Sequence, residues 1–294
     1  MKTDAPFDPS PSRPGDPPER PSVQFREATA LVAASPCGEW DLVLGQGPVI
    51  AAAVHDGHAM RASLQQYLHI DTPSRRRDED PLTGLFTTVG DVRLRARRSR
   101  FEVDLNRPRD KALSGDPADT WGIRFWKEEL PDDEIQRSLA IHDRFYAMLA
   151  ELLDALLQRH GTLLLLDLHS YNHRRDGADG PHAPAEANPD IDLGATTLDR
   201  ARWGHVVDTF AGEMRDAPVA GGAPDVRENV RYPGGGHFPE WVHHRYGDRI
   251  CTLSIEYKKT FMDEWTGQAD IARLYDLHAG LERAVRAVRG EFGR

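Results

Sequence analysis

The sequence predicts a single α/β domain built on a mostly parallel β-sheet with helices on both faces. Short, continuous apolar runs alternate along the chain with longer segments of helical periodicity, which is typical of buried strands joined by helices. The chain has 294 residues, enough for one large domain or two small ones. Its content of 39% hydrophobic and 29% charged residues indicates that most of it folds.

The N-terminal segment, residues 1–22, is expected to be a disordered tail. Seven of the 21 prolines fall within Met1–Pro21, where large apolar side chains are almost absent. Such a segment cannot bury enough surface to offset the entropy that is lost on ordering. We therefore assign the folded domain to residues 23–294.

Three apolar runs are predicted to form buried strands. Pro48–Val54 lies between a glycine and a His-Asp-Gly turn, and the other two runs are Thr162–Leu168 and Ile250–Tyr257. Residues Val92–Leu105 alternate between apolar and polar side chains at first and then continue as a second apolar series. One or two further strands are expected in that segment.

Three segments have the spacing of amphipathic helices. Asp132–His160 is the clearest, because apolar residues recur at helical intervals, Pro131 provides a start signal and Gly161 provides a stop signal. Arg200–Arg215 and Ile271–Arg289 show the same type of pattern.

Two long polar segments are expected to be loops. They are Thr72–Thr88 and Arg174–Asp192, and both are rich in proline, glycine and aspartate. Loops of this length are usually either functional or disordered.

Charge and hydropathy disfavour two classes of partner. The net charge of −10 and the pI of about 5.7 argue against a broad nucleic-acid surface, because phosphate binding needs clustered lysines and arginines. No apolar run approaches the ~20 residues needed to cross a membrane, and no secretory signal is visible. The two cysteines, Cys37 and Cys251, are too few for a disulfide framework, so a reducing, cytoplasmic location is expected.

Potentially reactive side chains lie at the ends of the three predicted strands. His55 follows the first run, His169 and Ser170 follow the second, and Glu256 lies near the end of the third. The carboxyl ends of parallel strands form the edge of the sheet where ligands bind. Two histidines and a carboxylate there would suit zinc, with a fourth position open for water. The alternative interpretation is that each histidine only caps its strand.

Several residues are candidates for a third metal ligand, and their spacing does not choose between them. His58 lies three residues after His55, with Asp56 between the two. Residues 78–80 supply three consecutive carboxylates, which include Glu79 and Asp80. A solvated acidic turn, balanced by the three preceding arginines, is the plainer interpretation of this segment.

The segment from Arg100 to Arg107 is a candidate site for an anionic substrate group. Asn106 and Arg107 can present an amide and a guanidinium fork, and arginine is suited to bidentate binding of a carboxylate. A structural salt bridge is the alternative interpretation.

The combined order of motifs resembles that of the N-formylglutamate amidohydrolase family over about residues 45–285. The string at 104–107, Asp-Leu-Asn-Arg, is also similar to that of the succinylglutamate desuccinylase and aspartoacylase group of zinc amidohydrolases. The motifs are His55-Asp-Gly, Glu79-Asp80-Pro, the tract DLHSYNHR at 167–174, DVREN at 225–229, IEYKK at 255–259 and FMDEWTG at 261–267.

This resemblance implies a fold similar to that of the zinc carboxypeptidases, a mixed eight-stranded sheet flanked by helices (phosphorylase/hydrolase-like). It also implies one zinc ion per chain, held by two histidines and a carboxylate. In the carboxypeptidase pattern a glutamate follows the first histidine ligand by three positions, whereas here that position is His58. We therefore expect the ligands His55, His169 and Glu79, with Glu79 preferred over Asp80 because Asp80-Pro81 more naturally begins a turn.

The activity that the resemblance implies is hydrolysis of the amide of an N-acyl acidic amino acid, such as N-formyl-L-glutamate, to formate and L-glutamate. Glu256 would act as the general base and then protonate the leaving amine. Asn106 and Arg107, with Arg100 as a further candidate, would hold a substrate carboxylate. Because such a substrate has two carboxylates, Lys258 and Arg227 are secondary candidates for another cationic partner.

Other functions are less well supported by the sequence. A non-catalytic protein that binds an anionic metabolite could use the same basic residues without a metal. Nucleotide binding on a flavodoxin-like sheet lacks the full glycine fingerprint, and a serine hydrolase would need a Gly-x-Ser-x-Gly elbow that the chain does not contain. The expected partner is a small molecule; the preferred acyl group and the oligomeric state stay open.

Overall fold

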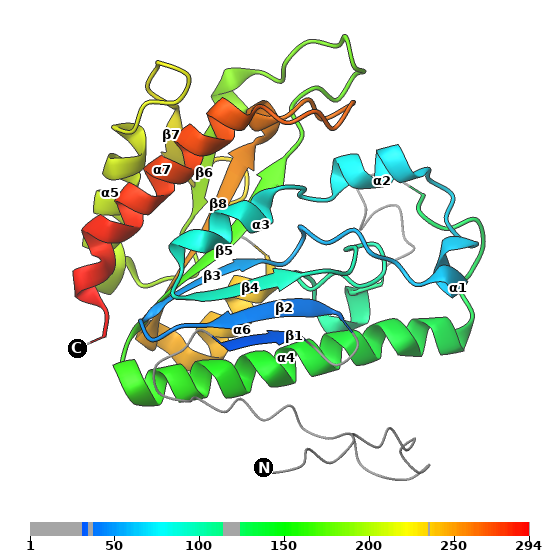
Figure 1. Ribbon diagram of the computed structural model, residues 1–294, viewed down its shortest axis with the longest axis horizontal. Helices are drawn as coiled ribbons and strands as arrows, with labels where there is room; N and C mark the ends of the chain where they lie inside the picture. The colour runs from blue at the N-terminus through cyan, green and yellow to red at the C-terminus, as the bar shows by residue number, and fades with distance from the viewer. Residues whose placement is uncertain (1–30, 35–37, 114–123, 235, 294) are drawn as a thin grey trace, which may run out of the picture.

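The computed structural model describes residues 31–34, 38–113, 124–234 and 236–293 (Figure 1). The predicted tail, residues 1–22, lies outside the described residues. Among the described residues, no helix is both long enough and apolar enough to cross a membrane.

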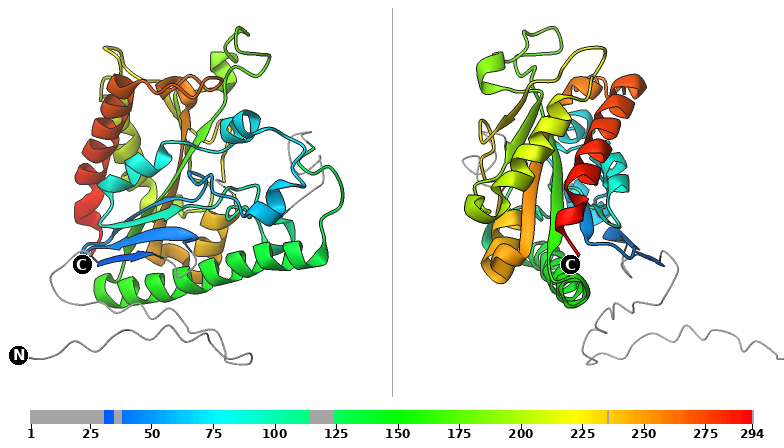
Figure 2. Two further views of the ribbon diagram at one scale, coloured as in Figure 1. Left: turned by 45° about the vertical axis from the view of Figure 1, so that its right-hand side comes forward. Right: turned by 90° about the vertical axis from the view of Figure 1, so that its left-hand side faces the viewer.

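The described residues form one eight-stranded sheet that is flanked by helices (Figures 1 and 2). The strands are β1 (Leu31–Ala34), β2 (Trp40–Leu44), β3 (Val49–Ala53), β4 (Val92–Ala96), β5 (Leu163–Tyr171), β6 (Ile191–Gly194), β7 (Val226–Glu228) and β8 (Ile250–Lys258). The α-helices are α1 (Ala62–Gln65), α2 (Thr72–Asp78), α3 (Thr83–Phe86), α4 (Asp132–His160), α5 (Arg200–Arg215), α6 (His237–Tyr246) and α7 (Ile271–Val288).

The sheet is mixed and mostly parallel, as the sequence analysis predicted. The strand order is β1-β2-β4-β3-β5-β8-β6-β7. The central strands β4, β3, β5 and β8 are parallel, whereas β2 and β6 join this centre in antiparallel orientation. The carboxyl ends of the central strands therefore lie at the same edge, where ligands bind in sheets of this kind.

The two faces of the sheet are covered by different helices. One hydrophobic cluster joins the sheet to α3, α5 and α7, and α5 and α7 lie side by side (Figure 1). The other cluster joins the opposite face to α4 and α6. Both β5 and β8 are buried along almost their whole length, which explains their continuous apolar runs.

Helix α4 has the bounds that the sequence predicted, because local signals mark both of its ends. Pro131 occupies the N-cap position, and acidic residues fill the first turn, where the helix dipole favours negative charge. Gly161 follows with a φ of 72°, a conformation that ends the helix and favours glycine. The predicted bounds of α5 are confirmed, and those of α7 are confirmed to within one residue.

Several predicted segments differ from the structure. Strand β5 continues past the predicted end at Leu168, so His169 and Ser170 lie within it, and the predicted loop Arg174–Asp192 includes the start of β6. Only the first part of Val92–Leu105 forms a strand, β4; the later apolar residues, Phe101, Val103 and Leu105, lie in a turn and loop. They are apolar because they pack into two hydrophobic clusters, although their backbone forms no strand. The segment Thr72–Thr88, expected to be a loop, contains α2 and α3.

Helix α2 forms because its N-terminus is capped locally. The Asp71 carboxylate accepts a hydrogen bond from the Ser74 backbone N–H at 2.8 Å. A proline lies in the first turn, and arginines occupy the last turn. The helix leads directly into the acidic segment that includes Glu79 and Asp80, so it also positions part of the site described below.

The buried face of α4 predicts a large effect of truncation at Leu149. This side chain is fully buried against the sheet, so Leu149→Ala should lower the free energy of unfolding by about 2–5 kcal/mol. The matched control is Gln158→Ala, at an exposed position of the same helix, where we expect little change. Denaturant unfolding of both variants tests this, and equal losses would contradict the assigned burial of α4.

Candidate active site

A cavity of about 650 Å³ opens at the carboxyl ends of the central strands. Its lining includes His55, Asp80, His169 and Glu256, which come from four separate parts of the chain. His55 follows β3, Asp80 follows α2, and His169 and Glu256 lie near the ends of β5 and β8. The topology of the sheet therefore gathers the histidines and the glutamate that the sequence analysis singled out.

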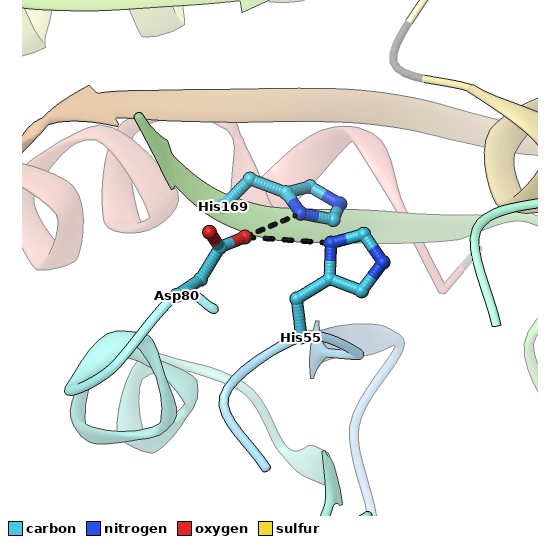
Figure 3. Close-up of side chains that lie close together, drawn as sticks. All are labelled: His55, Asp80 and His169. Atoms are coloured by element: carbon cyan, nitrogen blue, oxygen red, sulfur yellow. Dashed lines mark hydrogen bonds and ion pairs between the residues drawn. The ribbon is translucent and has the colours of Figure 1, made fainter. Parts of the chain in front are cut away.

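His55, Asp80 and His169 form a buried group whose ligand atoms all lie within 4.8 Å of one another (Figure 3). The Asp80 Oδ2 atom lies 3.0 Å from Nδ1 of His169 and 3.5 Å from Nδ1 of His55. Ligand atoms on one tetrahedral zinc ion, with bonds of ~2.0–2.2 Å, lie about 3.3 Å apart. The donor set thus suits a single zinc ion, and the two distances from Asp80 are close to this spacing.

The imidazole of His55 is oriented by a second carboxylate. Its Nε2 atom lies 2.7 Å from Oδ1 of Asp104, which is also buried. A proton on Nε2 is favoured by this contact, so the lone pair of Nδ1 faces Asp80. This buried Nδ1 atom has no hydrogen-bond partner among the described residues, as expected for an atom that binds a metal.

The imidazole of His169 also lies between two carboxylates. Its Nε2 atom lies 2.9 Å from Oδ1 of Asp167, and its Nδ1 atom faces Asp80. Burial disfavours the charged imidazolium, but the carboxylates of Asp167 and Asp80 outweigh it and raise the pKa of His169 well above its ordinary value. Burial likewise opposes ionisation of Asp80, but its contacts with the two imidazoles lower its pKa. The group is therefore arranged to stabilise positive charge at its centre.

The structure brings Asp80, rather than the expected Glu79, to the two histidines. Glu79 is buried elsewhere, where its Oε1 accepts a hydrogen bond from Nη1 of Arg75 at 2.6 Å and another from the Ser99 hydroxyl. Its backbone is extended at the end of α2, so that the two consecutive side chains leave in different directions. The expected turn at Asp80 is present just before α3, and this turn does not prevent the Asp80 carboxylate from reaching the site.

Burial also affects the protonation of Glu79. It raises the pKa of this carboxyl to about 7, although Ser99 and Arg75 favour the charged form. His58, the other candidate for the third ligand, has an exposed side chain that is not in the group.

Lys259 positions the segment that contains Asp80, a role that the sequence analysis did not identify. Its buried Nζ donates hydrogen bonds to the backbone carbonyls of Arg77 at 2.7 Å and Glu79 at 2.6 Å, and to Oδ1 of Asn172 at 3.0 Å. The Asp80 backbone N–H in turn donates to the His55 carbonyl at 3.0 Å. The end of α2 is thereby attached to β8 and to the end of β3.

Glu256 is placed beside the metal group by the pairing of two parallel strands. It lies opposite His169 in the register of β5 and β8, so the two side chains share a face of the sheet. Burial raises the pKa of Glu256 to about 8, while the nearby His169 opposes this shift. A carboxyl group with such a pKa can accept and release a proton near neutral pH.

Three of the predicted substrate-binding residues line the same cavity: Arg100, Asn106 and Arg107. Asp104 holds both arginines, with its Oδ2 at 2.9 Å from Nη2 of Arg100 and 3.4 Å from Nε of Arg107. The Asn106 Oδ1 atom accepts a hydrogen bond from the Phe238 backbone N–H at 2.8 Å, in the first turn of α6. Asp104 therefore contacts both His55 and the basic side chains of the cavity.

The other two predicted cations do not line this cavity. Lys258 forms an ion pair with Asp190 at 2.8 Å. Arg227 pairs with Asp225 at 3.0 Å and donates to the carbonyl of Glu186 at 2.7 Å. The structure instead brings other cations to the cavity, namely Arg77, Arg175, Arg231 and Lys259. Arg77 and Arg175 lie in the two segments expected to be loops, and Lys259 belongs to the IEYKK motif, whereas no local signal marked Arg231.

Comparison with known proteins shows a family match over most of the chain. Residues 47–262 match the family model of N-formylglutamate amidohydrolase. No curated protein matches the chain.

Solved structures show the same fold at low sequence identity. N-formylglutamate amidohydrolase from Ralstonia eutropha JMP134 superposes with a TM-score of 0.68 at 21% identity, and the match covers 86% of this chain and 99% of that one. A gene product of Agrobacterium tumefaciens superposes with a TM-score of 0.57 at 18% identity, covering 85% and 96% of the two chains.

The metal group predicts different effects of two neighbouring substitutions. Asp80→Asn removes the carboxylate shared by both imidazoles, so zinc affinity should fall by at least the ~10–100-fold that is typical for loss of an outer-shell partner. Glu79→Gln is the matched control, because Glu79 pairs with Arg75 and Ser99 and should leave about one zinc bound per chain. Titration of the metal-free proteins measures both affinities. A larger loss of zinc affinity in Glu79→Gln than in Asp80→Asn would identify Glu79 as the ligand instead.

Proposed function

The chain belongs to the N-formylglutamate amidohydrolase family and is therefore a hydrolase that acts on amide bonds, and from this premise we propose a zinc-dependent reaction. The substrate is an N-acyl acidic amino acid, and N-formyl-L-glutamate would give formate and L-glutamate. The observation that carries the proposal is the buried group of His55, Asp80 and His169 beside Glu256 in one cavity. The non-catalytic anion-binding alternative is not retained, because the family is one of enzymes.

His55, Asp80 and His169 would hold the zinc ion. A bound zinc ion polarises the scissile carbonyl and lowers the pKa of water. Asp104 favours a proton on Nε2 of His55, so that the Nδ1 lone pair of this ring faces the centre of the group, and the Nδ1 atom of His169 faces Asp80. These residues also fix the ring orientations, which limits the reorganisation needed when the site is loaded.

Glu256 would move the proton that amide hydrolysis requires. Its carboxylate accepts a proton from the attacking water and then delivers it to the nitrogen of the departing amine. The second step is needed because an amine is a poor leaving group until it is protonated. Burial supports this role, since it raises the pKa of Glu256 to about 8. Near neutral pH the free energies of proton uptake and release are then similar.

Asn106 and Arg107 would bind a carboxylate of the substrate. Both side chains line the cavity, and the contact of Asn106 with the first turn of α6 fixes the backbone between them. Arg100, held by Asp104, adds positive charge near the scissile bond. These contacts would orient the amide relative to His169 and Glu256, a positioning effect that contributes to rate.

Glu256→Gln is expected to remove the proton transfer while preserving the shape of the site. Turnover of N-formyl-L-glutamate should fall by about 10²–10⁴, the usual contribution of a positioned acid–base group, while about one zinc per chain is retained. Glu240→Gln serves as the control, since Glu240 is exposed at the rim of the same cavity. If Glu256→Gln kept most of its turnover, the general-base assignment would be wrong; if it lost zinc, Glu256 would be a ligand.

Arg107→Lys is expected to affect substrate binding more than chemistry. Lysine retains the charge but loses the planar fork that matches a carboxylate, so KM should rise about tenfold or more with a smaller change in kcat. Steady-state kinetics of the zinc-loaded variant distinguish the two parameters. A loss confined to kcat would instead place Arg107 at the reacting atoms.

A further inference from the structure

Arg231 differs from most other cations of the cavity in having no acidic partner. Arg77 pairs with Glu264 and Arg100 pairs with Asp104. Lys259 donates its three hydrogen bonds to neutral oxygens. In the described part of the chain no carboxylate lies within ion-pair distance of the Arg231 guanidinium, although it is half-buried. A half-buried charge without a counter-ion is costly, which indicates that an external anion completes the site.

The backbone around Arg231 is fixed by one buried carboxylate. Asp192 on β6 accepts hydrogen bonds from the backbone N–H groups of Val230 at 3.0 Å, Arg231 at 2.7 Å and Tyr232 at 2.8 Å. Asn229 precedes them with a positive φ of 56° and accepts a bond from the Ala195 N–H at 2.9 Å. Four consecutive residues are thus held in one conformation. Such rigidity is expected of a binding element.

The Arg231 side chain is also held in place. Its Nη1 donates a hydrogen bond to Oδ1 of Asn188 at 2.7 Å. Its guanidinium lies over the ring of Tyr171, with Cζ 5.0 Å from the centroid, and 5.2 Å from the centroid of the Tyr232 ring. Contacts with aromatic faces orient a guanidinium while leaving its charge uncompensated.

The position of Arg231 relative to the reacting groups is set by the sheet. Asp192, which holds its backbone, lies opposite Glu256 in the register of β6 and β8, and Glu256 lies opposite His169. Arg231 therefore enters the cavity from the β6 side. Asn106 and Arg107 reach it from the segment that follows β4. The cavity thus has two cationic binding elements on separate segments, as a substrate with two carboxylates requires.

We propose that Arg231 binds the side-chain carboxylate of an N-acyl acidic amino acid, so that it selects acidic over neutral side chains. This inference rests on the proposed function, in which Asn106 and Arg107 bind the other carboxylate. Arg175 also lines the cavity, but its side chain is exposed and no hydrogen bond to another described residue holds it. Arg231 replaces Lys258 and Arg227 as the second cationic partner.

The first test measures selectivity between two substrates of nearly equal shape. In zinc-loaded protein, Arg231→Gln should lower kcat/KM for N-formyl-L-glutamate by about 10- to 100-fold, the usual effect of losing a charged hydrogen bond. The neutral N-formyl-L-glutamine should be hydrolysed almost as before. Arg231→Lys should restore part of the preference for N-formyl-L-glutamate over N-formyl-L-glutamine. Arg200→Gln, which replaces an exposed surface arginine, should retain all of this preference. Equal losses on both substrates would show a structural role and overturn the proposal.

The second test does not depend on hydrolysis. Calorimetric titration of zinc-loaded protein with glutarate and with its monoamide compares a dicarboxylate with a monocarboxylate. The wild-type preference for glutarate should disappear in Arg231→Gln, and an unchanged preference would overturn the proposal. In a further outcome the wild type hydrolyses neither formyl substrate while the preference for glutarate still disappears in Arg231→Gln. That outcome would refute the proposed function and support the binding role of Arg231.

Discussion

The site depends on four buried carboxyl groups that surround two imidazoles. Asp80, Asp104, Asp167 and Glu256 are all buried near His55 or His169. Arg100 and Arg107 pair with Asp104, and His169 lies between Asp80 and Asp167. Buried carboxylates are tolerated when a cation is bound among them, and a divalent ion at the point where both Nδ1 atoms face Asp80 would supply it.

The sheet supplies one half of this arrangement and the connecting segments supply the other. Parallel pairing of β5 with β8 sets His169 beside Glu256 at a fixed strand spacing. Asp80 follows the short helix α2, which lies outside both strands. Its segment is held by Lys259 and by the backbone of His55. The rigid sheet thus positions Glu256 and His169, whereas hydrogen bonds between the connecting segments position Asp80.

A similar division applies to the substrate side of the cavity. Asn106 is fixed by the first turn of α6, and Arg231 is fixed by the Asp192 carboxylate on β6. Both anchors are partly buried polar contacts, which are costly to break in a low-dielectric interior. Consequently each binding element has its conformation set before any ligand arrives, which lowers the entropy lost on binding.

The sequence by itself determined the elements whose signals are local. The bounds of α4 follow from Pro131, Gly161 and helical periodicity, and the strands β3, β5 and β8 follow from continuous apolar runs that place His55, His169 and Glu256 at one edge. Short strands such as β6 and β7 carry too few residues for a clear pattern. They acquire strand structure from pairing with β8 and with each other.

Only the tertiary structure decided between neighbouring side chains of the same chemistry. Glu79 and Asp80 are both acidic, and the choice between them depends on the backbone at the end of α2 and on the distant Lys259. Likewise, Arg227 and Arg231 lie four residues apart, yet only Arg231 lines the cavity, because Asp192 holds the intervening turn. Contacts between residues far apart in the chain set these directions, and such contacts leave no periodic signal in the sequence.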